Sequence, residues 1–195
     1  TNCTISDGSK EGIYITSDYS KPASPTISGN TFKNLEYGIL GWNDSSNSSY
    51  DKVAPAITNN TFKENSVAGI ARVNGSITGN TFVNNKYAMQ FEQQAPSVIS
   101  GNTFSGPDDS SMVRLNGYIS GTLKPVENMG TGGSSYIIKN SDVYVGNGQT
   151  LTIKPGTVIK FDSGKTLTSC QNGGVLFNFL TPFQLMGFKT MRRKD

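Results

Sequence analysis

Histidine is absent from this chain of 195 residues, and ionisable side chains are few. Charged residues make up 16% of the sequence, tryptophan occurs once, and the net charge is +3. A small net charge without a basic stripe argues against nucleic acid as a partner. No apolar run approaches the ~20 residues that cross a bilayer, so no transmembrane segment is predicted. The sequence also predicts no metal site and no cofactor.

One short phrase repeats along the first part of the chain. ISGNTF at 27–32 returns as ITNNTF at 57–62, ITGNTF at 77–82 and ISGNTF at 99–104. A degenerate copy begins at Thr1 and has Cys3 in place of the repeated asparagine, and a copy one residue short closes the array at 119–123. Counted from Cys3 through these asparagines, the steps are 27, 30, 20 and 22 residues. Periods of this length predict a solenoid of stacked coils.

A second apolar phrase follows each copy of the first. It reads GIYI at 12–15, GIL at 38–40, GIA at 69–71, AMQF at 88–91 and MVRL at 112–115. Apolar residues two apart, set among Gly, Asn and Ser, predict short half-buried strands rather than helices. Two or three such strands per coil, paired with the next coil, predict a parallel β-helix that rises ~4.8 Å per coil.

The letters of the ISGNTF phrase take distinct roles in such a coil. Its Ile and Phe are predicted to point inward, as two apolar files on either side of a bend. The residue at the bend suits a positive φ, because it is Gly29, Asn59, Gly79 or Gly101. The asparagine after it is predicted to join a ladder of side-chain amides between coils. The ladder comprises Asn30, Asn60, Asn80 and Asn102.

The phrases NTFKNLEYGI and NTFKENSVAGI resemble the repeats of the pectin-lyase-like superfamily, particularly the NosD-like repeats of surface and periplasmic proteins. The resemblance covers residues 1–123. It implies an all-β fold, a right-handed single-stranded parallel β-helix. It implies no single activity, because that superfamily includes lyases, hydrolases, adhesins and modules without known chemistry.

The pattern changes after residue 123. Residues 124–135 contain one proline and three glycines and are predicted to be a linker or capping loop. Alternating apolar pairs from Tyr136, with tight turns at 146–148, 155–156 and 163–164, predict the start of a second β-helix segment over 136–195. Its end, with apolar residues 175–180 and a basic stretch at 191–195, is interpreted as a cap, a tail or a contact with another chain.

The two cysteines lie near opposite ends of the sequence, at Cys3 and Cys170. In a straight solenoid their Cα atoms would be much farther apart than the ~7 Å limit for a disulfide. One interpretation is two unrelated thiols, with Cys3 occupying a position of the asparagine ladder. The other is head-to-tail stacking, in which the coil near Cys170 meets Cys3 of the next copy. Such a contact does not close and would build a filament.

Candidate catalytic groups are sparse. The pectin-degrading hydrolases that the chain resembles use clustered Asp residues with a nearby His, which is missing here. The corresponding lyases use a calcium-binding carboxylate group and a Lys or Arg base, and Arg72 and Arg114 are the candidates for that base. Arg72 stands where the alternation expects an inward apolar group, so a bulge that turns it outward is the simpler interpretation. The pair Asp108-Asp109 is interpreted as solvated loop acid.

The one long insertion, at 41–51, carries the only tryptophan within a polar loop. Long loops on solenoids commonly hold the function. An aromatic ring with neighbouring amides and carboxylates suits sugar binding, or the Trp ring folds back and covers apolar surface. The candidate ligand-binding residues are Trp42, Asn43, Asp44 and Tyr50.

The scarcity of catalytic groups favours a non-catalytic structural module that assembles head to tail into filaments. Low charge and abundant Gly, Asn, Ser and Thr favour an extracellular or cell-surface setting. The alternatives are a carbohydrate-binding β-helix module centred on the Trp42 loop and a polysaccharide lyase. The predicted partners are therefore the chain itself or a polysaccharide. Because the sequence starts within a coil and without Met, we expect a processed or excised piece.

Overall fold

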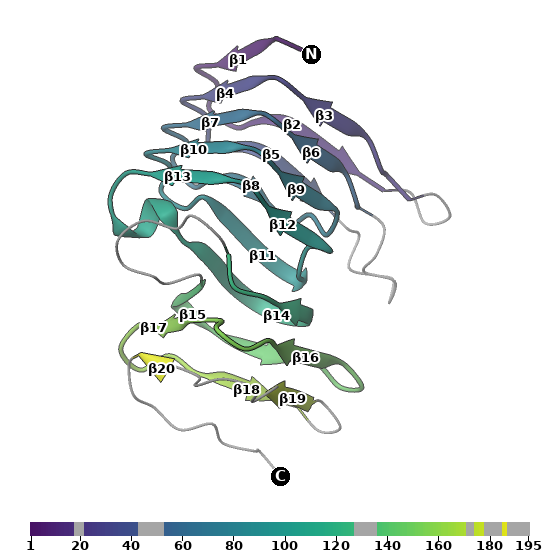
Figure 1. Ribbon diagram of the computed structural model, residues 1–195, viewed down its shortest axis with the longest axis vertical. Helices are drawn as coiled ribbons and strands as arrows, with labels where there is room; N and C mark the ends of the chain where they lie inside the picture. Colours follow the sequence, from purple (N-terminus) through teal and green to yellow (C-terminus); the bar gives the residue numbers. More distant parts are fainter. Residues whose placement is uncertain (18–21, 43–52, 127–135, 171–173, 178–184, 187–195) are drawn as a thin grey trace.

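The computed structural model is an all-β chain wound into a parallel β-solenoid of about 6 turns. It describes residues 1–17, 22–42, 53–126, 136–170, 174–177 and 185–186. The strands stack along the long axis, with β1 (Thr4–Ser6) near one end and β20 (Leu185–Met186) near the other (Figure 1). The all-β fold and the stacked parallel strands predicted from the repeats are thereby confirmed.

Three sheets form the sides of the solenoid. The first contains β1, β4 (Thr31–Lys33), β7 (Thr61–Lys63), β10 (Thr81–Val83) and β13 (Thr103–Ser105). The second contains β3 (Thr26–Ser28), β6 (Ala56–Thr58), β9 (Ser76–Thr78) and β12 (Val98–Ser100). The third and largest begins with β2 (Glu11–Thr16), β5 (Tyr37–Trp42), β8 (Ala68–Ala71) and β11 (Met89–Gln94). It continues with β14 (Val113–Leu123), β15 (Tyr136–Val145), β16 (Thr150–Ile153), β17 (Ile159–Phe161), β18 (Leu167–Ser169), β19 (Gly174–Phe177) and β20.

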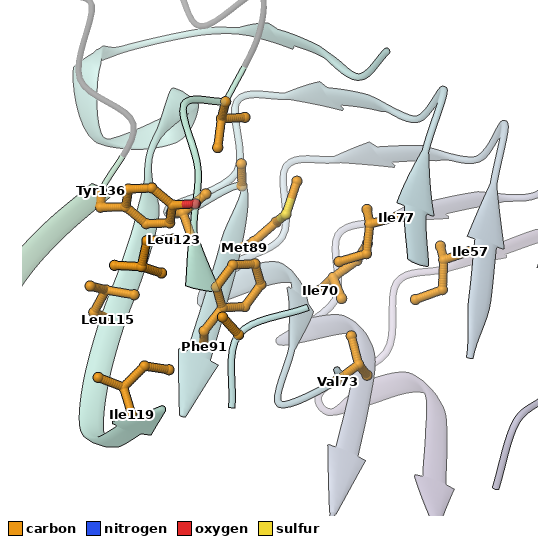
Figure 2. Packing of buried hydrophobic residues seen from close by; sticks show 14 of the residues in the cluster. Ile57, Ile70, Val73, Ile77, Met89, Phe91, Leu115, Ile119, Leu123 and Tyr136 are labelled. Atoms are coloured by element: carbon orange, nitrogen blue, oxygen red, sulfur yellow. The ribbon is translucent and has the colours of Figure 1, made fainter. Parts of the chain in front are cut away.

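The repeated phrase sets the register between coils. Phe32 pairs with Phe62, Phe62 with Phe82, and Phe82 with Phe104. Their rings stack at centroid distances of 5.1, 5.1 and 5.3 Å and within 13° of parallel. The isoleucines of the phrase form the second predicted file, and Figure 2 shows Ile57 beside Ile77 in the core. Each coil thus repeats the apolar contacts of its neighbour.

The bend between the two files has the predicted backbone conformation, with a positive φ. The φ angles are 69° at Gly29, 54° at Asn59, 66° at Gly79 and 62° at Gly101. The degenerate first copy also lies in register, since Thr4 pairs with Thr31, and the backbone N–H of Cys3 donates to Oδ1 of Asn30. Cys3 therefore stands at the edge of the asparagine ladder, in the position that the alignment of repeats assigned to it.

The asparagine side chains link successive coils. Nδ2 of Asn30 donates to Oδ1 of Asn60 at 3.1 Å, and the same bond joins Asn60 to Asn80 and Asn80 to Asn102. Backbone N–H groups of the first three residues donate to the same oxygens at 2.9 Å. Each oxygen satisfies two donors inside a bend, where an unpaired amide would be costly.

A second, shorter ladder occupies the next corner of the coil, and the repeat analysis missed it. Nδ2 of Asn65 donates to Oδ1 of Asn85 at 2.8 Å, and the backbone N–H of Leu35 donates to Oδ1 of Asn65. Both asparagines are buried. The corner that precedes them has a positive φ at Asn34, Glu64 and Asn84. Two corners of each central coil are therefore closed by amide side chains.

The glycine of the second phrase is needed for close approach between coils. A Cβ at Gly38 would lie 2.6 Å from both the carbonyl oxygen of Gly69 and Cδ1 of Phe62. Real Cβ atoms do not approach this closely, so the neighbouring coil would have to move. The phrase GI thus combines a position without a side chain with an isoleucine that points into the core.

The predicted sixth copy, at 119–123, is wrong. Ile119 pairs with Gln93 of β11, in the large sheet, and not with β12. The reason is that β14 is one strand of 11 residues that bends at Gly117, where φ is 61°. Among the described residues, the two smaller sheets end at β12 and β13, and only the large sheet continues.

Strands on both sides of the predicted linker are hydrogen-bonded neighbours. Val113 pairs with Tyr136 and Leu115 with Ile138, so β15 stacks directly on β14. The next coil follows, with β17 and β18 paired to β15. The predicted tight turns are present, with positive φ at Gly148, Gly156 and Gly164. Residues 127–135, and most of the segment interpreted as a cap or tail, lie outside the described residues.

Candidate functional site

Strands β5, β8, β11 and β14 are successive neighbours in the large sheet (Figure 1). Polar and aromatic side chains on or directly after these strands contact one another from coil to coil. Core residues alternate with them along the strands; Phe91 and Leu115 are examples in Figure 2. We call this site the arginine face and define it by five residues. They are Trp42, Arg72, Glu92, Arg114 and Asn116.

Arg72 stands at the centre of the arginine face. Strand β8 ends at Ala71, and Arg72 has a φ of 54°, which turns it out of the strand alternation. Its Nε lies 2.8 Å from Oε2 of Glu92, and its guanidinium lies 5.1 Å from the centre of the Trp42 ring. This position agrees with the prediction that Arg72 turns outward. The ion pair and the cation–π contact together fix the direction of the guanidinium.

Arg114 lies on the neighbouring part of the face and is bonded on several sides. Its Nη1 donates to Oε1 of Gln90 at 3.2 Å, and its Nη2 donates to Oδ1 of Asn116 and to the carbonyl oxygen of Lys139. Its guanidinium also lies 5.4 Å from the centre of the Tyr87 ring. The Nε of Arg114 is buried and has no partner among the described residues.

Asn116 connects the two arginines. Its Nδ2 donates to Oε2 of Glu92 at 3.5 Å, and its Oδ1 accepts from Oγ of Ser141 at 2.6 Å. Glu92 therefore receives hydrogen bonds from both Arg72 and Asn116. The result is one continuous network across β8, β11, β14 and β15, with side chains held before any ligand arrives.

Tyr37 is a further polar group beside the network and was not identified from sequence. Burial raises the pKa of Tyr37, the charge of Glu36 adds to the effect, and Arg72 and Arg114 oppose it. The phenol therefore stays protonated at neutral pH and can donate a hydrogen bond. The sequence signal was weak, because the residue before the second phrase varies between coils, from Tyr37 to Ala68 to Tyr87.

A small apolar cluster, separate from the main core, lies next to this network. Its buried members are Ala68, Ala71, Tyr87, Met112 and Ile137, and Tyr37 and Leu40 pack against it. It supplies a rigid base beneath the polar side chains. It also shields Arg114 from water, and hydrogen bonds gain strength where water is excluded.

The charges of the arginine face do not cancel. The five residues that define the face include two guanidinium groups and one carboxylate, that of Glu92, so together they carry a net positive charge, which favours an anionic ligand. Trp42 adds an aromatic surface that is 43% exposed. Such a site can stack against a ring, donate hydrogen bonds and attract a carboxylate or sulfate group.

The structure separates the sequence-predicted candidates. It brings Trp42, Arg72 and Arg114 onto one face, whereas Asn43, Asp44 and Tyr50 lie outside the described residues. Asp108 and Asp109 belong to a short 3-10 turn, η1 (Asp108–Ser111). Among the described residues, no group of three or more His, Cys, Asp or Glu is placed to hold a metal ion.

The cysteines remain far apart. Cys3 precedes β1 at one end of the stack and is exposed, while Cys170 follows β18 near the other end (Figure 1). Both are free thiols. The backbone N–H of Cys170 donates to the carbonyl oxygen of Val145 at 2.9 Å, which extends the pairing of β15 and β18.

No family model matches the chain, no curated protein matches it, and no solved structure matches it. In the part of the chain that the structure describes, no helix has the length and apolar character needed to cross a membrane.

Proposed function

We propose that this protein is a non-catalytic carbohydrate-binding module of the pectin-lyase-like kind, and that it binds an acidic polysaccharide on the arginine face. The observation that carries the proposal is the half-exposed Trp42 ring, with Arg72 held against it by Glu92. The proposed setting is extracellular or at a cell surface, where acidic polysaccharides are found.

Aromatic stacking supplies the first part of the recognition. The Trp42 ring is large, and its side chain has only two rotatable bonds, so ordering it on binding costs little entropy. The nearby Arg72 holds one part of the ring in place while 43% of the side chain remains accessible. The apolar face of a sugar ring can pack on this surface.

Charge supplies the second part. A guanidinium matches a carboxylate in shape and can form two parallel hydrogen bonds with it. Arg72 and Arg114 lie in one network through Glu92 and Asn116. Their two positive charges outnumber the single negative charge of Glu92. A chain of uronic acids offers both the ring and the carboxylate that this face can bind.

The same contacts argue against a proton-abstracting role. A lyase base needs a nitrogen that is free to face the substrate, and Nε of Arg72 is already engaged by the carboxylate of Glu92. The Nη atoms of Arg114 are likewise engaged by three acceptors. We therefore favour binding over the lyase alternative.

Removal of the Trp42 ring tests this proposal. For Trp42→Ala we expect about tenfold weaker binding of polygalacturonate, or about 1.4 kcal/mol, because buried aromatic contacts dominate binding energies. For Arg72→Ala we expect a comparable loss that shrinks as ionic strength rises, because added salt screens the attraction in the parent protein. Titration calorimetry with polygalacturonate measures both, and a neutral galactan serves as the uncharged comparison.

Lys63→Ala is the matched control for Arg72→Ala. It removes the same charge from the first sheet, where Lys63 is half-buried and pairs with Glu64 at 3.5 Å. We expect it to leave the affinity nearly unchanged. If Trp42→Ala and Arg72→Ala bind polygalacturonate as tightly as the unsubstituted chain, the arginine face is not the binding site.

A structural module that assembles head to tail is the second candidate. It is favoured by the position of the thiols, since Cys3 is exposed at one end of the stack and Cys170 is partly exposed near the other. We expect electron microscopy to show filaments whose axial repeat is close to the length of one solenoid. Shortening of the filaments by reductant would assign the joint to these thiols, whereas dispersed particles with and without reductant would contradict assembly.

A further inference from the structure

A cavity of about 310 Å³ lies away from the arginine face, around the bend of β14. It sits between the end of β11, the middle of β14 and the turn after β15 (Figure 1). Its main lining side chains and turn residues are Gln93, Tyr118, Ser120, Gly146, Asn147 and Gln149. The bend at Gly117, with a φ of 61°, lies between Asn116 of the arginine face and Tyr118 of the cavity.

Tyr118 lines this cavity and forms an exposed aromatic pair with Tyr144, its neighbour on the next strand. Tyr118 and Tyr144 are register partners on β14 and β15, and their ring centroids lie 5.7 Å apart at an angle of 40°. Tyr118 is 57% exposed and Tyr144 is 36% exposed. Large aromatic side chains with this much exposed surface contribute little to the core. Their polar tips and flat faces are instead typical of binding surfaces.

The turn after β15 forms one wall of the cavity. The backbone N–H of Gln149 donates to the carbonyl oxygen of Gly146 at 3.0 Å, and Gly148 has a φ of 70°. A Cβ at Gly146 would lie 3.6 Å from both Cδ1 of Tyr118 and Cγ of Gln149, which is ordinary contact. The turn therefore holds its amide side chains close to the Tyr118 ring without strain.

The lining is more apolar than polar, and none of its side chains is an acid or a base. Gln93, Asn147 and Gln149 contribute amides, and Ser120 contributes a hydroxyl that donates to the carbonyl oxygen of Gln93 at 3.0 Å. Amides both donate and accept hydrogen bonds, which suits hydroxyl groups. The volume lies at the lower end of the range for small-molecule sites, about 300–1,000 Å³, so the cavity suits one ring rather than a long chain.

We infer that this cavity is a second binding site, which takes a single neutral saccharide ring. The ring packs on Tyr118, which Tyr144 supports from the next strand, and its hydroxyls bond to the amides of Gln93, Asn147 and Gln149. The inference stands apart from the proposed binding of acidic polysaccharide, because it uses different residues and a ligand without charge. Experiment can therefore contradict the binding proposed at one site while confirming the binding proposed at the other.

Saturation-transfer NMR on the full chain tests the inference with methyl glycosides of glucose, galactose, mannose and N-acetylglucosamine as probes. We expect transfer to the ring protons of at least one glycoside. For Tyr118→Ala we expect about tenfold weaker binding. Gly146→Leu should abolish the signal by filling the cavity while both tyrosines remain.

Tyr14→Ala is the matched control, because Tyr14 is also an exposed tyrosine on the large sheet but lies on β2, far from the cavity. It should leave the signal intact, and Trp42→Ala should do the same. Circular dichroism confirms that each variant is folded. The inference is overturned if none of the four glycosides receives saturation, if Tyr118→Ala and Gly146→Leu keep the parent signal, or if methyl galacturonate binds as well as its neutral counterpart.

Discussion

Replacing Phe62 with alanine is expected to lower the free energy of unfolding by about 3–5 kcal/mol. Phe62 is completely buried and stacks on Phe32 above and Phe82 below, both at 5.1 Å. Its loss removes apolar burial and leaves a cavity inside a column that cannot collapse, because the coils are fixed at the strand spacing. Urea unfolding followed by circular dichroism measures the change.

Phe104→Ala provides the graded comparison. Phe104 stands at the end of the described file, contacts Phe82 at 5.3 Å and is only partly buried. We therefore expect a smaller loss, about 1–3 kcal/mol. Equal losses of unfolding free energy at Phe62 and Phe104 would show that stacking against a ring on both sides adds no stability to that gained from burying the ring.

Replacing Asn80 with alanine is expected to cost roughly 3 kcal/mol or more, because several buried groups lose their partners at once. Oδ1 of Asn80 accepts from the backbone N–H and the Nδ2 of Asn60. Nδ2 of Asn80 donates to the carbonyl oxygens of Ile57 and Thr78 and to Oδ1 of Asn102. Water cannot replace these bonds, since Asn80 is 0% exposed.

Asn80→Asp separates the hydrogen bonds that the Asn80 side chain accepts from those that it donates. Its oxygens can still accept from Asn60, but an ionised carboxylate cannot donate to Ile57 or Asn102. Burial favours the protonated form of a carboxyl group, so the deficit relative to the unsubstituted chain should shrink as the pH falls from 7 towards about 4. Urea unfolding at several pH values measures this recovery.

Asn30→Ala is the control for the ladder, because Asn30 is only partly buried and water can reach the groups it leaves behind. We expect a loss of about 1 kcal/mol. A cost at Asn80 no greater than that at Asn30 would mean that the ladder repeats in sequence without stabilising the fold.

Strong local repetition made much of the fold predictable. The phrase ISGNTF contains an inward residue on each side of a bend, a residue suited to positive φ, and the amide that closes the bend. Each copy therefore specifies the same local conformation, and identical copies align most favourably with one another. For this reason the register of Phe62 with Phe82 and the positive φ at Asn59 could be predicted without the structure.

Features that depend on single residues or on bends were missed. The second ladder uses Asn65 and Asn85, but Leu35 occupies that position in the preceding coil, so no repeat was apparent. The false sixth copy at 119–123 begins with the same letters, ISG, but lacks the asparagine and the phenylalanine, and β14 carries it into the large sheet. A short phrase determines its own bend, but the strand that precedes it determines which neighbour it reaches.

The candidate sites also combine features that the sequence predicted with contacts that only the structure shows. The outward turn of Arg72 followed from a break in its alternation, whereas its partner Glu92 is 20 residues away and could not be assigned. The position of Glu92 depends on the register shift between Phe91 and Gln93, which only the pairing of β11 with β14 reveals. Likewise, Tyr118 and Tyr144 become neighbours only because β15 stacks on β14.

The sequence by itself determined the coil: its strands, its bends, its apolar files and the Asn30 to Asn102 ladder. These depend on interactions between like residues in successive repeats, which the period alone brings together. The tertiary structure decided which residues outside the repeated phrases meet across the coils, namely Arg72 with Glu92 and Tyr118 with Tyr144. Coils of unequal length and local bends set those contacts, and they are resolved only when the whole solenoid is wound.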